Sequence, residues 1–580
     1  MHKHSIQNHQ AVIRVYPQNT WLLFENPVGF IQSYCAAEVF DCLLEIDDLV
    51  QNKGKYAAGF LSYESSPAFD PCFKVKTGDK FPLLRFGIFD TVRALHRLVC
   101  DRQQGAFPAW RTNTDFANYQ SRIQSIKNLI EAGESYQINY TLRLYARFAC
   151  DPWQFFVNLA LAHDPPYACY LDYPDFSVCS FSPELFFQMD KEKLISRPMK
   201  GTAPRGLVAW EDDMLARQLQ RCTKNMAENV MITDMVRNDF GRIAEPGSVE
   251  TSSLFGVEKY PTVWQMVSEV TCKSKANIPA VFNALFPPAS ITGAPKAAAM
   301  DIIARLETAL RKIYTGSIGY MGPDRQCQFN VAIRTVLVDK KNNSAEYGVG
   351  GGIVWDSDAH SEWQECKIKS QALYRIRPEF NLFESILWTP QGGYHLLGAH
   401  LARLKTSAHF FKFNFDMLKV KCTLHEFVES LISACKVRLE LSKSGHVIIE
   451  QKPIMGLPDV INVSLAKEAV SSSNVFLYHK TTCREAYEKA EPRKKSAHDI
   501  ILWNEKGEVT ETTIANLVLD FGERLYTPPV KSGLLPGTYR QFLLSSGIIQ
   551  EKIISVSELQ FCKRIYLVNS VRGFMKGALV

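Results

Sequence analysis

Apolar residues change their spacing several times along the chain, and each change predicts a different element. Residues 1 to about 110 carry short apolar runs between turns, as in KYAAGFLSYESSPAFDP (55–71), so we expect mainly strands there. DFANYQSRIQSIKNLIEA (115–132) has apolar residues at helical spacing and stops before Gly133, which predicts a helix. Further predicted elements are strands at 168–189, helices at 223–243, 294–311 and 359–376, and a hairpin with a glycine-rich second strand at 335–358.

A change of character near residue 378 divides the chain. The stretch RPEFN (377–381) is typical of a linker, and strands, helices and a Pro/Gly-rich stretch (527–540) follow it. A length of 580 residues suggests roughly two to four domains. We expect an α/β fold of the mixed α+β kind, with domains at 1–377 and 378–580.

Composition narrows the class of protein. Hydrophobic residues make up 46% and charged residues 22%, as in globular proteins with a full core. The net charge of +6 is spread over the chain without a long Lys/Arg run, which argues against a nucleic-acid partner. The start lacks the apolar segment of a secretory signal, and no apolar run is long enough to span a membrane. The 15 cysteines form no C-x-x-C pair, which favours a reducing cytoplasm and buried single thiols.

Two polar residues of the first half lie in unusual surroundings. Lys200 lies in RPMKGTAPRG, where Pro198 and Pro204 stiffen the flanks, so it is either a surface charge or a nucleophile held at a site. Glu184 follows SFSP at the end of a predicted strand. It is either a turn carboxylate facing water or a general acid or base with a raised pKa.

Three further features could bind charged groups. Glu228 on a predicted helix is a hard oxygen ligand suited to Mg²⁺, or part of a polar helix face. Glu362, Glu365 and Lys369 share one helix face, where a cation can bridge the carboxylates or a salt-bridged stripe can face water. The run Gly350–Gly352 offers open backbone amides to an anion, as in a nest, although a bulge or turn explains it equally well.

Ordered blocks across residues 1–377 resemble the chorismate-utilising enzymes. They are GESYQINYTLR, SPELFF, RPMKGTAPRG, KNMAENVMITDMVRNDFGRI, EPGSV, ITGAPKAAAMDII, YTGSIGY, FNVAIRT, GVGGGIVWDSD and EWQECKIK. This family includes anthranilate synthase component I, isochorismate and salicylate synthases, and aminodeoxychorismate synthase component I. The resemblance implies a large α/β sandwich with its site between two sheets.

The resemblance also implies roles for individual residues. Glu228 and Glu365, with Glu362 beside them, match the family's Mg²⁺ carboxylates. The positions that match those holding the carboxylates of chorismate are Gly201, Thr202, Tyr314, Arg334, Gly350, Gly352 and Lys369. The charges agree with this, because a dicarboxylate is bound well by a metal ion, an arginine fork and backbone amides.

Lys200 distinguishes activities inside this family. Anthranilate synthases resemble PIAGT at this place, whereas aminodeoxychorismate synthases resemble PIKGT. In the latter, the lysine amine attacks C2 of chorismate and expels the C4 hydroxyl, and ammonia then attacks C4 and displaces the lysine. Glu184 is the proton donor to the leaving hydroxyl in this reading. Gln265 stands where many relatives have a histidine near the departing enolpyruvyl group, which argues against pyruvate elimination in this domain.

The second half contains a separate set of candidate residues. Lys480 follows the strand-like run NVFLYH, Glu511 lies in GEVTETTIANLVLD, and Gly537 and Thr538 open a predicted helix. Each of these residues alone can be explained without a functional role; Lys480, for example, can be an ordinary surface lysine. Together they are what pyridoxal phosphate requires: a lysine for its aldehyde, a carboxylate for its ring nitrogen and a helix N-terminus for its phosphate.

This ordered set resembles the fold-type IV pyridoxal phosphate enzymes. They include branched-chain and D-amino acid aminotransferases and 4-amino-4-deoxychorismate lyase. HLARLKTSAHFFKF matches an H-x-x-R-L block that implies Arg403 near the phosphate, and VNSVRG implies Asn569 and Arg572 on the substrate side. Relatives usually begin with an additional strand and a D-x-G-x-x-Y-G-D-G-like turn, which this chain lacks before FNLFES. We therefore expect weaker cofactor binding or substrate closure.

The two resemblances imply consecutive reactions that end in 4-aminobenzoate, a folate precursor. The first domain would aminate chorismate, and in the second Lys480 would remove the C4 proton while Glu511 keeps the cofactor nitrogen protonated. No G-x-C-x-G segment of a glutamine amidotransferase is present, so we expect ammonia from a separate subunit. The alternatives are an anthranilate synthase component I, a C-terminal aminotransferase, and a C-terminal domain that only docks a partner.

Overall fold

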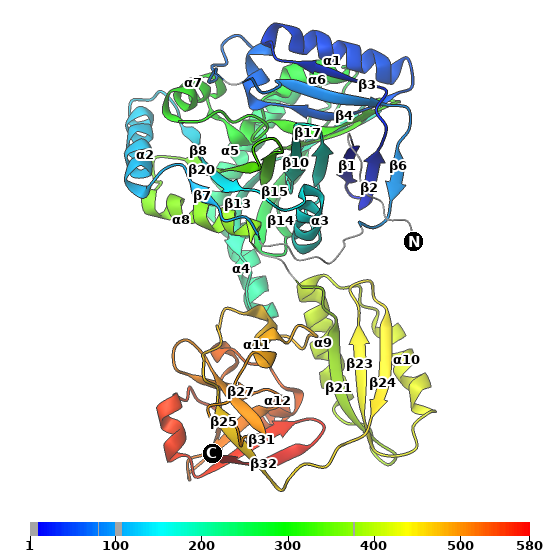
Figure 1. The fold of residues 1–580 in the computed structure, drawn as a ribbon, viewed down its shortest axis with the longest axis vertical. Coiled ribbons are helices and arrows are strands. Elements are labelled where there is room, and N and C mark those ends of the chain that lie inside the picture. The colour runs from blue at the N-terminus through cyan, green and yellow to red at the C-terminus, as the bar shows by residue number, and fades with distance from the viewer. Residues whose placement is uncertain (1–9, 79, 99–106, 375–377) are drawn as a thin grey trace. The chain divides into compact units, whose positions relative to one another are not determined.

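The computed structural model describes residues 10–78, 80–98, 107–374 and 378–580, which form two compact units (Figure 1). The first unit comprises Met1–Pro204 and Ala216–Arg377, and the second comprises Arg205–Leu215 and Pro378–Val580. The short segment 205–215 thus belongs to the same unit as the C-terminal part of the chain. Residues 1–9 and the first residue of the expected linker, Arg377, lie outside the described residues.

The described part of the first unit contains two large, mainly antiparallel sheets. The first has the order β16 (Gly293–Ala294), β8 (Gln137–Arg147), β20 (Ser344–Ile353), β19 (Thr335–Asp339), β10 (Phe176–Ser180), β9 (Cys169–Asp172), β1 (Gln10–Val15), β2 (Thr20–Phe24), β6 (Arg93–Leu95), and β7 (Arg111–Thr112) pairs with β8. The second has the order β13 (Met199–Pro204), β15 (Val263–Lys273), β12 (Lys193–Arg197), β11 (Leu185–Asp190), β18 (Gln326–Val331), β17 (Ser317–Gly322), β4 (Tyr56–Leu61), β5 (Leu84–Phe89), β3 (Gly29–Ser33), and β14 (Glu250–Lys259) pairs with β15.

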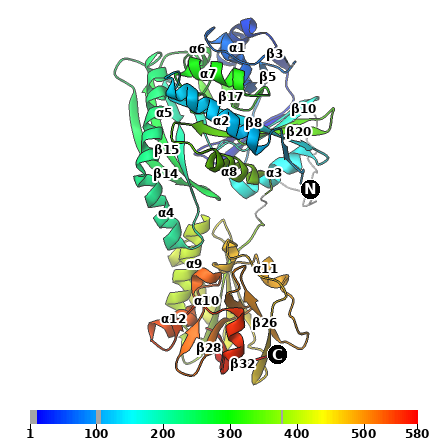
Figure 2. The ribbon, with the colours of Figure 1, turned by 90° about the vertical axis from the view of Figure 1, so that its left-hand side faces the viewer.

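The two sheets pack face to face, as the alternation of their side chains dictates. Ile13 of β1 and Phe60 of β4 belong to one shared core cluster, whereas their neighbours Val12 and Leu61 point to the outer faces. The helices of this unit are α1 (Ala36–Gln51), α2 (Phe116–Glu131), α3 (Pro152–His163), α5 (Thr223–Gly241), α6 (Ile278–Leu285), α7 (Lys296–Leu306) and α8 (Ala359–Ser370). Figures 1 and 2 show α1 and α6 over β3 to β5, and α2 beside α8 over β8 and β20. The predicted layered α/β sandwich is confirmed.

The second unit contains a four-stranded and an eight-stranded sheet in its described residues. The smaller sheet has the order β22 (Gly393–Tyr394), β21 (Leu382–Thr389), β23 (Cys435–Leu441), β24 (Val447–Lys452). The larger has the order β27 (Val509–Thr512), β26 (Asp499–Trp503), β25 (Val460–Leu465), β32 (Gly573–Leu579), β31 (Arg564–Asn569), β28 (Asn516–Asp520), β29 (Leu525–Thr527), β30 (Gln550–Glu551). Its helices are α9 (Leu397–Phe411), α10 (Met417–Val428), α11 (Glu485–Glu488) and α12 (Thr538–Ser545), and α4 (Ala209–Arg221) begins in it.

Three expectations about local structure were wrong. Residues 36–51 form helix α1 rather than strands, because Val39, Leu43 and Ile46 recur at helical spacing and are buried. NVFLYH (474–479) contains a 3₁₀ turn at Val475–Leu477 rather than a strand. The run Gly350–Gly352 is extended strand paired with β8, so its amides do not form a nest.

In the described part of the chain, no helix combines the length and the apolar character needed to cross a membrane. No disulfide bond joins the cysteines of the described segments. The cytoplasmic location stays a prediction.

Candidate active sites

Lys200 lies at an irregularity of strand β13 that turns its side chain inward. The pairing of β13 with β15 shifts register between Met199 and Thr202, and Gly201 has a φ of 96°, which favours glycine. The Lys200 side chain is 17% exposed, and its Nζ lies 3.7 Å from Glu228 Oε2 on α5. A Cβ atom added to Gly352 would lie 2.6 Å from the same Nζ. Lys200 is therefore an interior group beside the glycine strand and not a surface charge.

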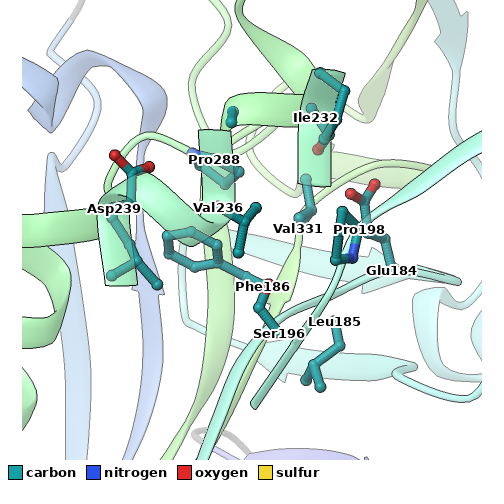
Figure 3. A pocket seen from close by; sticks show the side chains of 13 residues that line it. Glu184, Leu185, Phe186, Ser196, Pro198, Ile232, Val236, Asp239, Pro288 and Val331 are labelled. Atoms are coloured by element: carbon teal, nitrogen blue, oxygen red, sulfur yellow. The ribbon is translucent and has the colours of Figure 1, made fainter. Parts of the chain in front are cut away.

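Glu184, directly before β11, is buried with 4% exposure. Burial raises the pKa of its carboxyl group to about 7, although the nearby charge of Lys200 acts in the opposite direction. Figure 3 shows Glu184 beside Pro198, at the edge of a small pocket that Val236 and Asp239 also line. The carboxyl group can thus carry a proton near neutral pH.

Helix α8 presents the predicted acidic face to the glycine strand. Its N-cap Asp358 accepts a hydrogen bond from the Ser361 amide at 2.8 Å, which starts the helix at Ala359. A Cβ atom at Gly351 would lie 3.2 Å from Glu362 Oε2 and 3.8 Å from Glu365 Oε1. Both carboxylates therefore face one point that only a glycine leaves open.

Lysines neutralise this acidic face. Lys369 Nζ lies 2.6 Å from Glu365 Oε1 and donates to the Gly350 carbonyl at 2.8 Å. Burial and the charge of Glu365 raise the pKa of Glu362. Burial acts to raise the pKa of Glu365 as well, but the hydrogen bond from Lys369 and the charges of Lys369, Lys200 and Lys224 together lower it.

The carboxylates of this face also bear on the predicted Mg²⁺ site. Among the described residues, no group of three or more His, Cys, Asp or Glu side chains converges tightly enough to hold a metal ion. The carboxylate oxygens of Glu228, Glu362 and Glu365 are of the kind that Mg²⁺ prefers, so the chemistry of the donors is suited to the ion although the three groups do not converge in this arrangement.

The remaining predicted substrate contacts differ in their surroundings. They are Tyr314, Thr202 and Arg334. Tyr314 is buried against Gly348, whose added Cβ would clash with its ring. Thr202 Oγ1 donates to Gln265 Oε1 at 3.0 Å. Arg334, with a φ of 50°, lines a separate small pocket, and in the described residues no contact of its side chain with Lys200 is found.

Gln265, which the sequence analysis singled out, and Asn229, which it did not, hold the Lys200 strand in place. Gln265 Nε2 donates to the Gly201 carbonyl at 2.9 Å, so this amide spans β13 and β15. Buried Asn229 donates to the Lys200 carbonyl at 3.4 Å and accepts from Ser268. The one indication in the sequence that Asn229 belongs to the site is that it directly follows Glu228.

The second unit brings all its predicted residues to one pocket with about 1370 Å³ of empty volume. The predicted residues that line it are Lys480, Arg403, Glu511, Gly537, Thr538, Asn569 and Arg572. Lys480 Nζ lies 4.7 Å from the centre of the Phe383 ring. Burial lowers the pKa of Lys480 to about 8, and the charge of Arg403 acts in the same direction.

The backbone next to Lys480 is fixed by strand β21. The Phe383 amide donates to the Lys480 carbonyl at 3.0 Å, and the Thr482 amide donates to the Asn381 carbonyl at 2.9 Å. The segment that contains Lys480 is thus hydrogen-bonded along the edge of β21.

Glu511 is held by three donors. It accepts hydrogen bonds from the Tyr487 hydroxyl at 2.8 Å, the Asn516 amide group at 2.9 Å and the Leu535 amide at 3.1 Å. Burial raises its pKa to about 7, and no ion pair of Glu511 is found in the described part of the chain. A protonated ring nitrogen would supply the missing positive charge, so the residue fits its proposed role toward pyridoxal phosphate.

Gly537 and Thr538 begin helix α12, whose first amides are free for an anion. A Cβ atom on Gly537 would lie 1.9 Å from Asn516 Oδ1, so the close approach requires glycine. Arg403 donates from Nε to Glu384 Oε1 at 2.9 Å and from NH1 to the Pro536 carbonyl at 3.1 Å. This arrangement fits a phosphate group.

Glu384 and His400 support this end of the pocket without having been predicted. His400 Nδ1 lies 2.7 Å from Glu384 Oε2, and its Nε2 lies 3.3 Å from Thr538 Oγ1. The H-x-x-R-L block contained this histidine as its first residue. At the opposite end, Asn569 Oδ1 accepts from the Val571 and Arg572 amides, which fixes a turn.

Comparison with known proteins matches two family models to two parts of the chain. The family model described as chorismate binding enzyme matches residues 6–375, and the model described as amino-transferase class IV matches residues 381–579. Aminodeoxychorismate synthase component 1 of Klebsiella aerogenes is 39% identical over 259 residues, or 44% of this chain and 57% of that protein. The chain thus matches little more than half the length of this relative.

Two anthranilate synthase subunits are also similar. The protein named anthranilate synthase component 1 3 of Haloarcula marismortui is 31% identical over 363 residues, which cover 55% of this chain and 72% of that protein. The crystal structure of anthranilate synthase component I from Streptococcus pneumoniae TIGR4 has a TM-score of 0.53 and 23% identity, and covers 65% of this chain and 94% of that chain. The likeness to the solved structure shows the fold. The chain therefore belongs to the family of chorismate binding enzymes, and its residues 381–579 are similar to amino-transferase class IV.

Proposed function

We propose that the chain is a fused enzyme that converts chorismate into 4-aminobenzoate in two consecutive reactions. The first unit aminates chorismate at C4 with Lys200 as a covalent catalyst, and the second eliminates pyruvate from the product. The observation that carries the proposal is the position of Lys200, whose side chain is 17% exposed and lies beside the glycine strand, 3.7 Å from Glu228. The similarity to aminodeoxychorismate synthase component 1 supports it.

The first reaction uses the Lys200 amine and the Glu184 carboxyl group. The amine nitrogen forms a bond to C2 of chorismate, both ring double bonds shift by one position, and the C4 hydroxyl leaves as water with a proton from Glu184. Ammonia then forms a bond to C4 and releases Lys200 from C2. A buried carboxyl group with a pKa near 7 is suited to donating this proton.

Substrate carboxylates would be held by the groups around the glycine strand. Mg²⁺ at Glu228, Glu362 and Glu365 would supply positive charge for one of them. Gly201, Thr202, Gly350, Gly352 and Lys369 remain the proposed contacts near Lys200, together with Tyr314 and Arg334. Gln265 cannot transfer a proton as histidine does, and its amide holds the Gly201 carbonyl, so this unit does not eliminate pyruvate.

The second reaction takes place in the pocket of Lys480. Pyridoxal phosphate, held by Arg403, Gly537 and Thr538, would supply an electron sink for the substrate. Lys480, with a pKa near 8, takes the proton from C4 of the substrate, and pyruvate leaves as the ring becomes aromatic. Glu511 keeps the ring nitrogen of the cofactor protonated, and Asn569 and Arg572 face the substrate.

The ammonia is proposed to come from a separate glutamine amidotransferase subunit. The name component 1 of the similar enzymes indicates a second component, and this chain lacks a segment of the glutaminase type. Free ammonium at high pH should replace that subunit in an assay.

Product analysis with labelled ammonium tests the proposal. The full-length protein is incubated with chorismate, Mg²⁺, pyridoxal phosphate and ¹⁵N-ammonium, and the product is identified by chromatography and mass spectrometry. We expect labelled 4-aminobenzoate. Labelled anthranilate would overturn the proposal, and aminodeoxychorismate as the end product would restrict it to the first unit.

A further inference from the structure

One wall of the Lys480 pocket carries charges that the proposed chemistry does not use. Strand β23 alternates between core residues, such as Val437 and Leu439, and residues of the opposite face. Lys436 and Arg438 project from that opposite face and line the pocket together with Phe383 and other residues. The sequence pattern thus places two cations side by side on one wall.

Lys436 lies among like charges. In the pairing of β23 with β24 its direct partner is Lys452, and such a cross-strand pair of like charges is destabilising. Burial lowers the pKa of Lys436, and the charges of Lys452, Arg572 and Arg438 act in the same direction. An anion at this wall would relieve the repulsion.

The neighbours of Lys436 have partners, whereas none is found for Lys436 among the described residues. Arg438 Nε donates to Glu440 Oε1 at 2.6 Å, and Lys452 Nζ lies 3.3 Å from Glu450 Oε2. For the Lys436 ammonium group, neither an ion pair nor a hydrogen bond is found within the described segments of the chain. A half-buried cation without a partner is costly unless a ligand pairs with it.

The pocket lining as a whole is strongly cationic. Its basic residues are Arg403, Lys436, Arg438, Lys480, Arg484 and Arg572, and its acidic residue is Glu511. Arg403 and Lys480 are assigned to the cofactor. Adjacent residues on one face of a strand are about 7 Å apart, which suits two carboxylates on opposite sides of one ring-sized molecule.

We propose that Lys436, with Arg438 and Arg572 beside it, recognises the second carboxylate of the substrate and selects dicarboxylates over monocarboxylic amino acids. The inference rests on the proposed lyase function of this pocket and adds its specificity residues.

Ligand binding by the full-length protein loaded with pyridoxal phosphate tests this inference. The probes are 3-(carboxymethoxy)benzoate, which has two carboxylates, and 3-methoxybenzoate, which has one. We expect the wild type to bind the first at least about tenfold more tightly, because each additional charge-assisted pair contributes on this scale. Lys436→Met should abolish this preference and leave binding of the monocarboxylate unchanged.

Lys452→Met is the matched control, because it removes a charge from the same strand pair at a position that does not line the pocket. It should keep the preference for the dicarboxylate. In turnover of aminodeoxychorismate, Lys436→Met should raise KM with little change in kcat, and thermal unfolding checks that the variant is folded.

The outcomes separate this inference from the proposed function. If Lys436→Met keeps the dicarboxylate preference while the enzyme makes 4-aminobenzoate, the role proposed for Lys436 is wrong. The proposed function is then unaffected. Equally weaker binding of both probes by Lys436→Met would also contradict the role proposed for Lys436. A wild type that prefers the dicarboxylate but releases no pyruvate from aminodeoxychorismate would support carboxylate recognition at this wall. It would contradict the lyase activity proposed for the second unit.

Discussion

At the scale of single residues, the proposed chemistry of the first unit depends on a buried carboxyl group and a half-buried amine. Glu184 has a carboxyl group whose pKa burial raises to about 7, and Lys200 has an amine next to Glu228. The sequence pointed to both because of their flanking residues, but their burial follows from strands that are distant along the chain.

The pH dependence of amination should report the proton on Glu184. Its protonated form is lost as the pH rises through about 7, so kcat for amination should fall above that pH. Glu184→Gln should remove this dependence and lower kcat by about 10²–10⁴-fold, the usual contribution of a general acid. Asp239→Asn, which changes another carboxyl group of the same pocket, serves as the control and should retain the pH limb. An unchanged rate in Glu184→Gln would exclude the acid role.

Replacement of Lys200 should abolish amination without converting the enzyme. Lys200→Ala removes the nucleophile, and Lys200→Arg keeps a positive charge near Glu228 but cannot form the bond to C2. We expect neither variant to make aminodeoxychorismate, and neither to make anthranilate, because Gln265 holds the Gly201 carbonyl where a proton donor would be needed. Chromatography of the products measures this. Substantial anthranilate from Lys200→Ala would contradict the role given to Gln265.

At the scale of elements, local patterns were predictable and long-range neighbours were not. The spacing of Glu362, Glu365 and Lys369 fixed one face of α8, because helical periodicity is a local property. The approach of Gly352 to Lys200 joins strands that belong to different sheets, and nothing in either segment specifies it.

The errors also have physical reasons. Helix α1 carries its apolar residues at helical spacing, yet they lie within a region of short apolar runs that also suits strands. NVFLYH is rich in residues that favour strands, but tertiary contacts override such a short preference. Asn229, and the hydrogen bond of Gln265 to Gly201, were not predicted because both involve the backbone of another element.

The glycine strand β20 should tolerate no side chain at position 352. A Cβ atom there would lie 2.1 Å from Gln137 Nε2 and 2.6 Å from Lys200 Nζ, and both are ends of side chains that must move. Gly352→Ala should therefore lower kcat/KM for amination at least about tenfold, because misplacement of a reacting group by about 1 Å has effects of this size or larger. Steady-state kinetics measure it, and turnover of added aminodeoxychorismate should be unaffected.

Gly241→Ala is the control for this change, since an added Cβ at the end of α5 meets no atom within 4 Å. It should leave amination unchanged. Normal amination by Gly352→Ala would show that this strand does not form a wall of the site.

At the scale of the whole molecule, the second unit is built from two separate stretches of the chain. Within it, Arg205 binds Asp212 through Nε at 2.6 Å and through NH2 at 2.8 Å, and Asp212 is fully buried. The ring of His479, next to Lys480, lies with Nε2 3.2 Å from the Leu207 carbonyl oxygen. Burial lowers the pKa of His479 to about 4, so the ring is neutral and its Nε2–H donates to that carbonyl.

Loss of the Arg205 pair should destabilise the second unit. Arg205→Ala removes the cation that is paired with buried Asp212, and removing one member of a buried pair costs about 3–5 kcal/mol. We expect an unfolding transition at lower temperature and weaker retention of pyridoxal phosphate in the full-length protein, measured by calorimetry and absorbance. Arg237→Ala breaks an exposed pair with Asp234 and should cost less than about 1 kcal/mol. Equal stability of the two variants would contradict the role of segment 205–215.

The product released by matched lysine variants tests the central claim most directly. Wild type, Lys200→Ala and Lys480→Ala are each incubated with chorismate, ammonium, Mg²⁺ and pyridoxal phosphate, and the products are quantified. If the two units act in sequence, we expect 4-aminobenzoate from the wild type and aminodeoxychorismate from Lys480→Ala. We expect neither product from Lys200→Ala. Anthranilate from the wild type, or 4-aminobenzoate from Lys480→Ala at the wild-type rate, would contradict the account.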